Sequence, residues 1–269
     1  MVVFRPDSNP SMRKSLSQWL LRRPAVPAWA SLQAACQQRG WVAKLTHEHD
    51  GFVVEAPAWR MEWGPAQRDY LGSHELRLRA DIAVDPQLHA LVMPRALMAQ
   101  LEQALYRQFV ESVQTRLDDE TPEEVRWLAV SERLSSAQLG PLATDFGAVG
   151  NDSGWLTAWL GGPLSPALAA WRPADAGESE APPAMALMLR RGQLVWRLAL
   201  ARPTASDLIS AVKVFETAWH ALTPTLDAAQ AVDGAGGNAG RQGHGPAAST
   251  PGEPPAESGL SGSGAEPDA

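Results

Sequence analysis

The residues that could bind a metal ion gather at one place in the chain. His47, His49 and Asp50 form the one cluster that resembles a set of metal ligands. On an extended strand, residues two positions apart share a face, so both imidazoles would point the same way and Asp50 would add an oxygen. The same residues also lie at the tip of a predicted hairpin, where polar side chains are simply solvated. A zinc site would need a further ligand such as His74 or His89, so we predict no metal site and no cofactor.

A second cluster is basic. Arg60, Arg77 and Arg79 alternate with apolar residues on two predicted strands, and Arg68 lies in the loop between these strands. Guanidinium groups on one face can bind an anion. Three acids interleave with them: Glu62, Glu75 and Asp81. The interleaving favours a cross-strand charge ladder on a solvated face. We keep the four arginines as candidate binding residues.

Motifs for catalysis are weak in this chain. The Gly-rich segments at 146–150 and 161–162 match neither a phosphate-binding loop nor a dinucleotide fingerprint. In the segment 150–154 the serine is one position too late for a nucleophile elbow. Cys36 lies on the apolar face of a predicted helix, which is typical of a packed thiol. These patterns favour a protein that is not an enzyme.

Tryptophan is frequent, with 11 residues in the chain. Trp155, Trp159 and Trp171 fall in a segment rich in Gly and Pro. Large aromatic side chains in such a segment either pack against the core or present a binding surface. Packing is the favoured interpretation, and Trp155 and Trp159 are kept as candidate binding residues.

The elements that position these residues follow from periodicity. Alternation of apolar and polar residues predicts strands, and spacings of three and four predict helices. The Asp50-Gly51 pair predicts a hairpin turn, and Thr121–Glu124 has the pattern of a capping box. Strands are predicted at 41–47, 52–56, 59–63, 74–83, 185–189 and 193–201, and helices at 30–39, from 94 to about 113, from 122, at 155–160, 166–171 and 204–222.

Two expectations concern the faces of the predicted sheet. The long helix that starts at Pro94 should lie across the four-stranded meander. Trp196 should pack beneath the last helix against Val212 or Phe215, and Arg197 should point to the opposite face, because neighbouring residues on a strand alternate. That opposite face is either solvated or covered by the insert. Together the elements predict an α+β fold with an antiparallel sheet, a meander plus a C-terminal hairpin, flanked by helices.

Composition sets the boundaries of the domain. We expect a flexible N-terminus at 1–10, a single α+β domain at 11–222 with an irregular helical insert at about 135–183, and a disordered Gly/Pro-rich acidic tail at 223–269. The formal net charge is −7, and five of these negative charges lie from Asp227 onward, which leaves −2 for the domain. A nearly neutral domain does not indicate nucleic-acid binding.

Location and source are also predicted from composition. One cysteine excludes a disulfide framework, and no long apolar run or secretory pattern is present, so we expect a cytoplasmic protein that does not bind membranes. Only three of the 23 basic residues are lysines, which is typical of a GC-rich bacterial genome.

The order of elements from about Trp29 to Leu222 resembles the type III secretion chaperone-like fold, the Tir-chaperone class. The hairpin at 185–201 that leads into the helix at 204–222 carries most of the resemblance. It departs from that class by an extra strand and the insert. The resemblance implies a partner-binding scaffold without a catalytic site, commonly a homodimer.

These observations predict a non-catalytic protein-binding or adaptor module whose partner is a protein. The alternative is a small-molecule-binding domain or an enzyme with a pocket between the sheet and the 135–183 insert.

Overall fold

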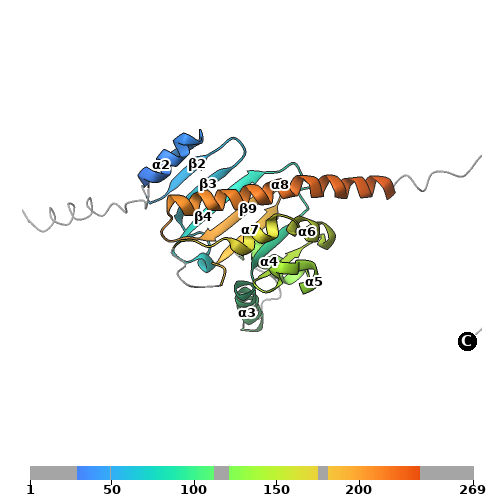
Figure 1. Cartoon of the computed structure of the whole chain (residues 1–269). Coiled ribbons are helices and arrows are strands. Elements are labelled where there is room, and N and C mark those ends of the chain that lie inside the picture. The colour runs from blue at the N-terminus through green and yellow to red at the C-terminus, as the bar shows by residue number, and fades with distance from the viewer. Residues whose placement is uncertain (1–28, 49, 112–120, 175–180, 237–269) are drawn as a thin grey trace, which may run out of the picture. The chain divides into compact units, whose positions relative to one another are not determined.

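The computed structural model describes residues 29–48, 50–111, 121–174 and 181–236. The chain divides into two units, Met1–Ala231 and Val232–Ala269, and the account below concerns the first. Figure 1 shows its helices and strands. The predicted α+β fold with an antiparallel sheet flanked by helices is confirmed.

Among the described residues, nine strands form one sheet in the order β1-β2-β3-β4-β9-β8-β5-β7-β6. All of the neighbouring strands are antiparallel. The strands are β1 Val42–Leu45, β2 Phe52–Glu55, β3 Arg60–Pro65, β4 His74–Asp81, β5 Ala90–Pro94, β6 Glu132–Arg133, β7 Phe146–Gly150, β8 Met185–Arg190 and β9 Gln193–Ala199.

The helices are α2 Trp29–Gln38, α3 Arg95–Glu111, α4 Glu123–Val130, α5 Ser136–Leu139, α6 Ser153–Leu160, α7 Leu164–Ala170 and α8 Ala205–Gly236, with 3-10 turns η1 Asp69–Leu71 and η2 Gly140–Ala143. Among the described residues, no helix is long and apolar enough to cross a membrane.

Both predicted hairpins form, but only the second has a two-residue turn. In the first, Leu45 pairs with Phe52 and Thr46 N donates to the backbone oxygen of Gly51, so the connection is longer than the predicted Asp50-Gly51 turn. In the second, Arg190 pairs with Gln193, so the loop is Arg191-Gly192, and both loop residues have positive φ, 49° and 72°. Two positive φ values are the signature of the mirror-image turn that matches the twist of paired strands. β4 then pairs with β9 along its whole length, which joins the meander to the C-terminal hairpin.

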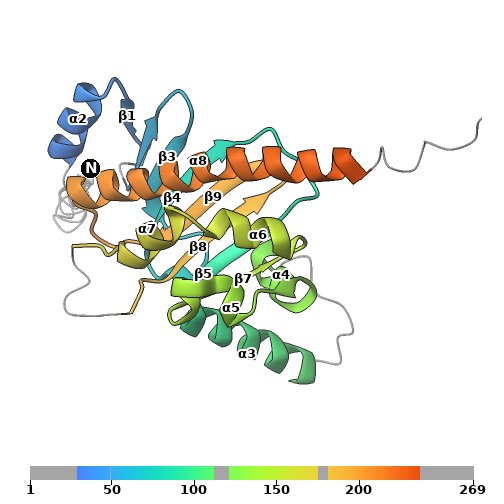
Figure 2. The same cartoon turned by 45° about the vertical axis from the view of Figure 1, so that its right-hand side comes forward.

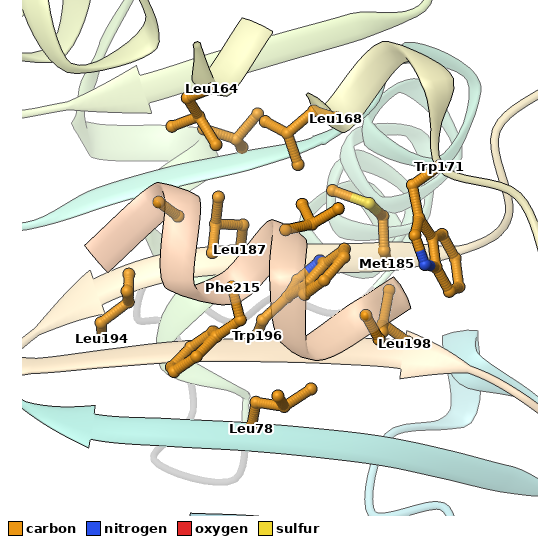
Figure 3. Close-up of a cluster of buried hydrophobic side chains, with 14 of the residues drawn as sticks. Leu78, Leu164, Leu168, Trp171, Met185, Leu187, Leu194, Trp196, Leu198 and Phe215 are labelled. Carbon is orange, nitrogen blue, oxygen red and sulfur yellow. The ribbon is translucent and has the colours of Figure 1, made fainter. Parts of the chain in front are cut away.

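The main core lies on one face of the sheet, beneath α2, α6, α7 and α8 (Figure 2). The prediction for Trp196 is confirmed: it is fully buried in the same cluster as Val212 and Phe215 of α8. Figure 3 shows Trp196 and Phe215 in one layer with Trp171, whose ring meets that of Trp196 edge to face at 5.4 Å. The final helix begins as predicted, because Thr204 and Asp207 form a reciprocal cap.

The opposite face carries a second, smaller core beneath α3 and α4. Leu91, Met93, Val149, Met188 and Val195 contribute to it from the strands. The prediction that the long helix crosses the meander is therefore wrong: α3 packs on β5 and β7 instead. Periodicity identifies the apolar face of a helix but does not identify the surface that covers it.

The insert predicted at 135–183 is not purely helical, because it contains β7, a buried strand of the sheet. Glycines are typical of loops, so the two glycines of β7 kept the sequence pattern from predicting a strand there. A methyl group at Gly147 would lie 2.6 Å from Met98 Sδ, and one at Gly150 would lie 2.9 Å from the backbone oxygen of His89. Glycine is present where α3 and β5 approach the strand closely. β5, the partner of β7, was also missed, because it is apolar without alternation.

The C-terminal boundary is also corrected, since α8 continues to Gly236, beyond the predicted tail start at residue 223. The remainder of the predicted tail, 237–269, and the predicted flexible N-terminus, 1–10, lie outside the described residues.

Candidate functional site

Polar side chains line the face of the sheet that carries the second core, on the strands β1 to β4 and on β9. They alternate with core residues such as Leu78 and Trp196, so they point away from α8. We call these residues the charged face: Lys44, Glu55, Arg60, Glu62, Glu75, Arg77, Arg79, Asp81 and Arg197. Five are basic and four are acidic, so the charged face has one surplus positive charge.

Glu62 lies at the centre of the charged face and contacts three arginines. Its Oε1 is 2.7 Å from Arg60 Nε and 3.4 Å from Arg79 Nη2, and its Oε2 accepts a hydrogen bond from Arg77. Burial by itself would raise the pKa of Glu62, but the bond from Arg77 and the three positive charges lower it below its ordinary value. The structure thus brings together three of the four arginines predicted to bind.

The interleaved acids and bases form ion pairs between neighbouring strands, as in the predicted charge ladder, but like charges also lie directly opposite one another. Across β3 and β4, Arg60 is directly opposite Arg79, and across β4 and β9, Arg77 is directly opposite Arg197. Like charges at directly opposite positions repel. The acids relieve this repulsion from diagonal positions: Glu62 is opposite Arg77 but also contacts Arg60 and Arg79. The sequence could not show this, because it does not specify which strands are neighbours.

One end of the charged face is buried. Arg197 is 5% exposed, and its Nη1 donates to both carboxylate oxygens of Glu75 at 2.8 and 3.0 Å. Arg197 points to the face opposite that of Trp196, as predicted, and this face is covered at β9 from the side of α3 and α4 and not by the predicted insert. Burial lowers the pKa of the Arg197 guanidinium, and Glu75 opposes that shift.

Arg68 is apart from the other three candidate arginines. Its Nε lies 2.5 Å from Glu124 Oε1 at the start of α4, and the Tyr70 hydroxyl donates to the same oxygen at 2.9 Å. Burial by itself would raise the pKa of Glu124, but Arg68 and Tyr70 lower it below its ordinary value. Burial and the neighbouring Glu124 both raise the pKa of the Tyr70 hydroxyl, so Tyr70 remains a donor. Arg68 therefore connects α4 to the loop between β3 and β4.

The capping box predicted at Thr121–Glu124 is not formed. The N-cap residue of α4 is Pro122, which makes no side-chain cap bond. The reason is that the Glu124 carboxylate is bound to Arg68 and Tyr70 instead. The sequence pattern identified Arg68 and Glu124 separately but did not predict their contact, because they are 56 positions apart.

The metal-like cluster is only partly described, because His49 lies outside the described residues. Asp50 accepts a hydrogen bond from the Thr46 hydroxyl at 2.7 Å. The histidines suggested as further ligands are engaged elsewhere: His74 stacks on Trp63, and His89 stacks on Trp127 and lies 2.8 Å from the Ser131 hydroxyl. Within the described ranges, no group of three His, Cys, Asp or Glu residues could hold a metal ion.

The tryptophans of the predicted insert pack into the core. Trp155 and Trp159 are buried and stacked on each other at 5.4 Å, and Trp159 Nε1 donates to the backbone oxygen of Ala218. Their candidacy as binding residues is corrected, since α6 turns both rings toward α8. Cys36 is buried as expected, and burial raises the pKa of its thiol, so it is a poor nucleophile.

Two open hollows lie on the charged face, on the side of the sheet opposite to α6 and α7. The first, of about 310 Å³, is lined by residues that include Arg60, Glu62, Gln67 and Arg77. The second, of about 530 Å³, lies at the strand ends beside the turn at 56–58 and is lined by residues that include Arg60 and Arg79. Both arginines are therefore exposed to a partner, whereas Glu62 lies deeper.

This arrangement presents fixed charges and no activated nucleophile among the residues that line it. It is chemically suited to recognition by ion pairs and hydrogen bonds. Compared with protein-family models, with curated proteins and with solved structures, the chain matches none of them.

Proposed function

We propose that this protein is a non-catalytic binding module that docks a protein partner on its charged face. The observation that carries the proposal is the uneven cover of the sheet. On the side of the charged face, α3 and α4 pack over β5, β7, β8 and β9, and no helix of the described residues packs over β1, β2 and β3.

The uncovered half is accessible. The side chains of Lys44, Glu55, Arg60 and Arg79 are 65, 44, 40 and 39% exposed. Ion pairs hold these long side chains in place, which lowers the entropy lost when a partner binds. A surface of this kind supports binding more than catalysis, since its hollows are open and its acids and bases already neutralise one another.

Two further observations support a protein as the partner. The charged face is rich in arginine, which is enriched at protein interfaces, where its fork of donors gives directional contacts. The order of elements also resembles that of the type III secretion chaperone-like fold, which implies a partner-binding scaffold without a catalytic site. The alternative, a pocket between the sheet and the predicted insert, has less support, because Leu164, Leu168 and Trp171 fill most of that layer with core side chains (Figure 3). One open hollow of about 400 Å³ lies at its edge, lined by residues that include His74, Pro173 and Pro182.

The test is quantitative capture from a native lysate with the full chain as bait. Three baits are compared: the unmodified protein, the double variant Lys44→Glu/Arg60→Glu, and the control Arg95→Glu/Arg107→Glu. The control residues are exposed on α3, away from the charged face. We expect a protein that the unmodified bait and the control bait retain and the first variant loses.

Thermal unfolding midpoints of the three proteins, measured in parallel, show whether each bait is folded. Equal capture by all three folded baits would contradict the proposal. A metabolite that raises the unfolding midpoint equally in all three, without any captured protein, would favour the small-molecule alternative.

A further inference from the structure

The charged face has one place where two exposed arginines share a single acid. Arg60 and Arg79 are directly opposite each other on β3 and β4, where Cβ atoms of paired residues are about 5 Å apart. Both contact one oxygen, Glu62 Oε1. A single carboxylate oxygen is thus shared by two guanidinium groups, which together offer ten N–H donors.

Much of this donor capacity is unused. Glu62 is the one acidic contact of Arg79 among the described residues, at the long distance of 3.4 Å. Arg60 has a second acidic contact, Glu55 Oε1, also at a long distance, 3.5 Å. Both side chains line the 530 Å³ hollow, so their remaining donors are accessible from solvent.

The geometry points to an anchor site for a carboxylate: we propose that Arg60 and Arg79 together bind an acidic side chain of an extended segment of the protein partner. This inference rests on the proposed function and names the partner's chemistry. A carboxylate accepts parallel hydrogen bonds from a guanidinium group and would place a negative charge between two positive ones.

The charges around the pair indicate a carboxylate on a peptide more than a phosphate or a nucleic acid. Glu55 and Asp81 line the same hollow, and Asp81 accepts a hydrogen bond from Gln193 at 2.8 Å. The lining of the hollow therefore has two bases, Arg60 and Arg79, and two acids, Glu55 and Asp81, so its charges balance. The two flanking acids repel a polyanion, while a single carboxylate fits between the two guanidinium groups.

The experiment measures fluorescence anisotropy of a labelled ten-residue Gly/Ser peptide with a single central Glu (the Glu peptide), titrated with the full chain in low salt. The same peptide with Gln in place of Glu (the Gln peptide) is the uncharged comparison. We expect saturable binding of the Glu peptide and a Kd higher by about tenfold or more for the Gln peptide.

Variants locate the site. Arg60→Gln/Arg79→Gln should raise the Kd for the Glu peptide by about tenfold or more, and Arg95→Gln/Arg107→Gln on α3 should leave it within about twofold. Arg79→Lys, which keeps the charge but loses the fork, should give an intermediate Kd. Unfolding midpoints confirm that each variant is folded.

Three results would overturn the inference: no saturable binding of the Glu peptide, equal loss in the two double variants, or displacement of the peptide by millimolar inorganic phosphate or by a short DNA duplex at equal charge. If lysate capture still depends on Lys44 and Arg60 while the Glu peptide fails to bind, the binding function stands and only the acidic anchor fails. If capture is independent of the charged face, the proposed function fails as well.

Discussion

At the scale of single residues, similar side chains on the same face of the sheet differ in their exposure to solvent. Arg60 and Arg197 both alternate with core residues, yet Arg60 is accessible and Arg197 is buried. The difference comes from α4, which reaches β9 and η1 but not β3. A buried charge is tolerated only where a partner neutralises it, and Glu75 is that partner.

The Arg197–Glu75 pair predicts a clear mutational pattern. Arg197→Met leaves the buried carboxylate of Glu75 with only its longer contact, 3.5 Å to Arg77, and should cost about 3 kcal/mol of unfolding free energy. The double variant Glu75→Leu/Arg197→Met removes both charges and should recover most of that loss, since apolar replacements of buried pairs are often neutral.

Urea titration of the two variants and the unmodified protein measures this coupling. Equal destabilisation in the single and the double variant would show that the shape of the two side chains, and not their charge, determines their contribution to stability.

At the scale of elements, the turn between β8 and β9 controls the central strands of the sheet. β9 joins the meander to β8, so the hairpin links both halves. Its loop residues, Arg191 and Gly192, both have positive φ, which strains any residue with a side chain. A β-carbon at Gly192 would also lie 3.2 Å from the backbone oxygen of Ile82.

We predict that Gly192→Ala lowers the unfolding free energy by about 1–2 kcal/mol, because alanine resists a φ of 72°. The matched control is Gly154→Ala in α6, where φ is not positive and the nearest atom to the new β-carbon is 3.5 Å away. That substitution should leave stability unchanged or raise it by up to about 1 kcal/mol, because alanine favours a helix. Thermal and urea unfolding of both variants provide the comparison, and a larger loss at Gly154 would contradict the interpretation of the turn.

At the scale of the whole molecule, ionised carboxylates connect separate elements of the fold. Glu62 of β3 joins β3 to β4 through Arg77 and Arg79, and Glu124 joins α4 to Arg68 and to Tyr70 of η1. In both acids the folded-state pKa is below the ordinary value of 4.5. A lowered pKa means that the folded state binds the proton more weakly than the unfolded state does.

The pH dependence of stability follows from the lowered pKa of these two acids. The contribution of Glu62 and Glu124 is complete above the ordinary pKa of 4.5 and is lost as the pH falls from there through the folded pKa. We expect the urea midpoint to be level near neutral pH and to fall below pH 4.5. Glu124→Gln should be less stable at neutral pH and should show a shallower decline with acid; an unchanged decline would exclude Glu124 as a source.

The sequence by itself determined the local elements and which face of each is apolar. The pairing of β1 with β2, the buried faces of β3 and β4, the cap at Thr204 and the burial of Trp196 could all be predicted, because each depends on residues close in the chain or on simple alternation. The candidate arginines were found in the same way, and three of the four lie together.

Only the tertiary structure decided what covers each surface. The placement of α3 and α4, the strand β7 with its glycines, the Arg68–Glu124 contact and the burial of Arg197 all depend on residues far apart in the chain. Periodicity reports that a side chain points to one face of a strand, but the solvent exposure of that face depends on which other element packs against it. That packing depends on residues far apart in the sequence. In this protein it leaves the arginines of β3 and β4 accessible and buries the arginine of β9.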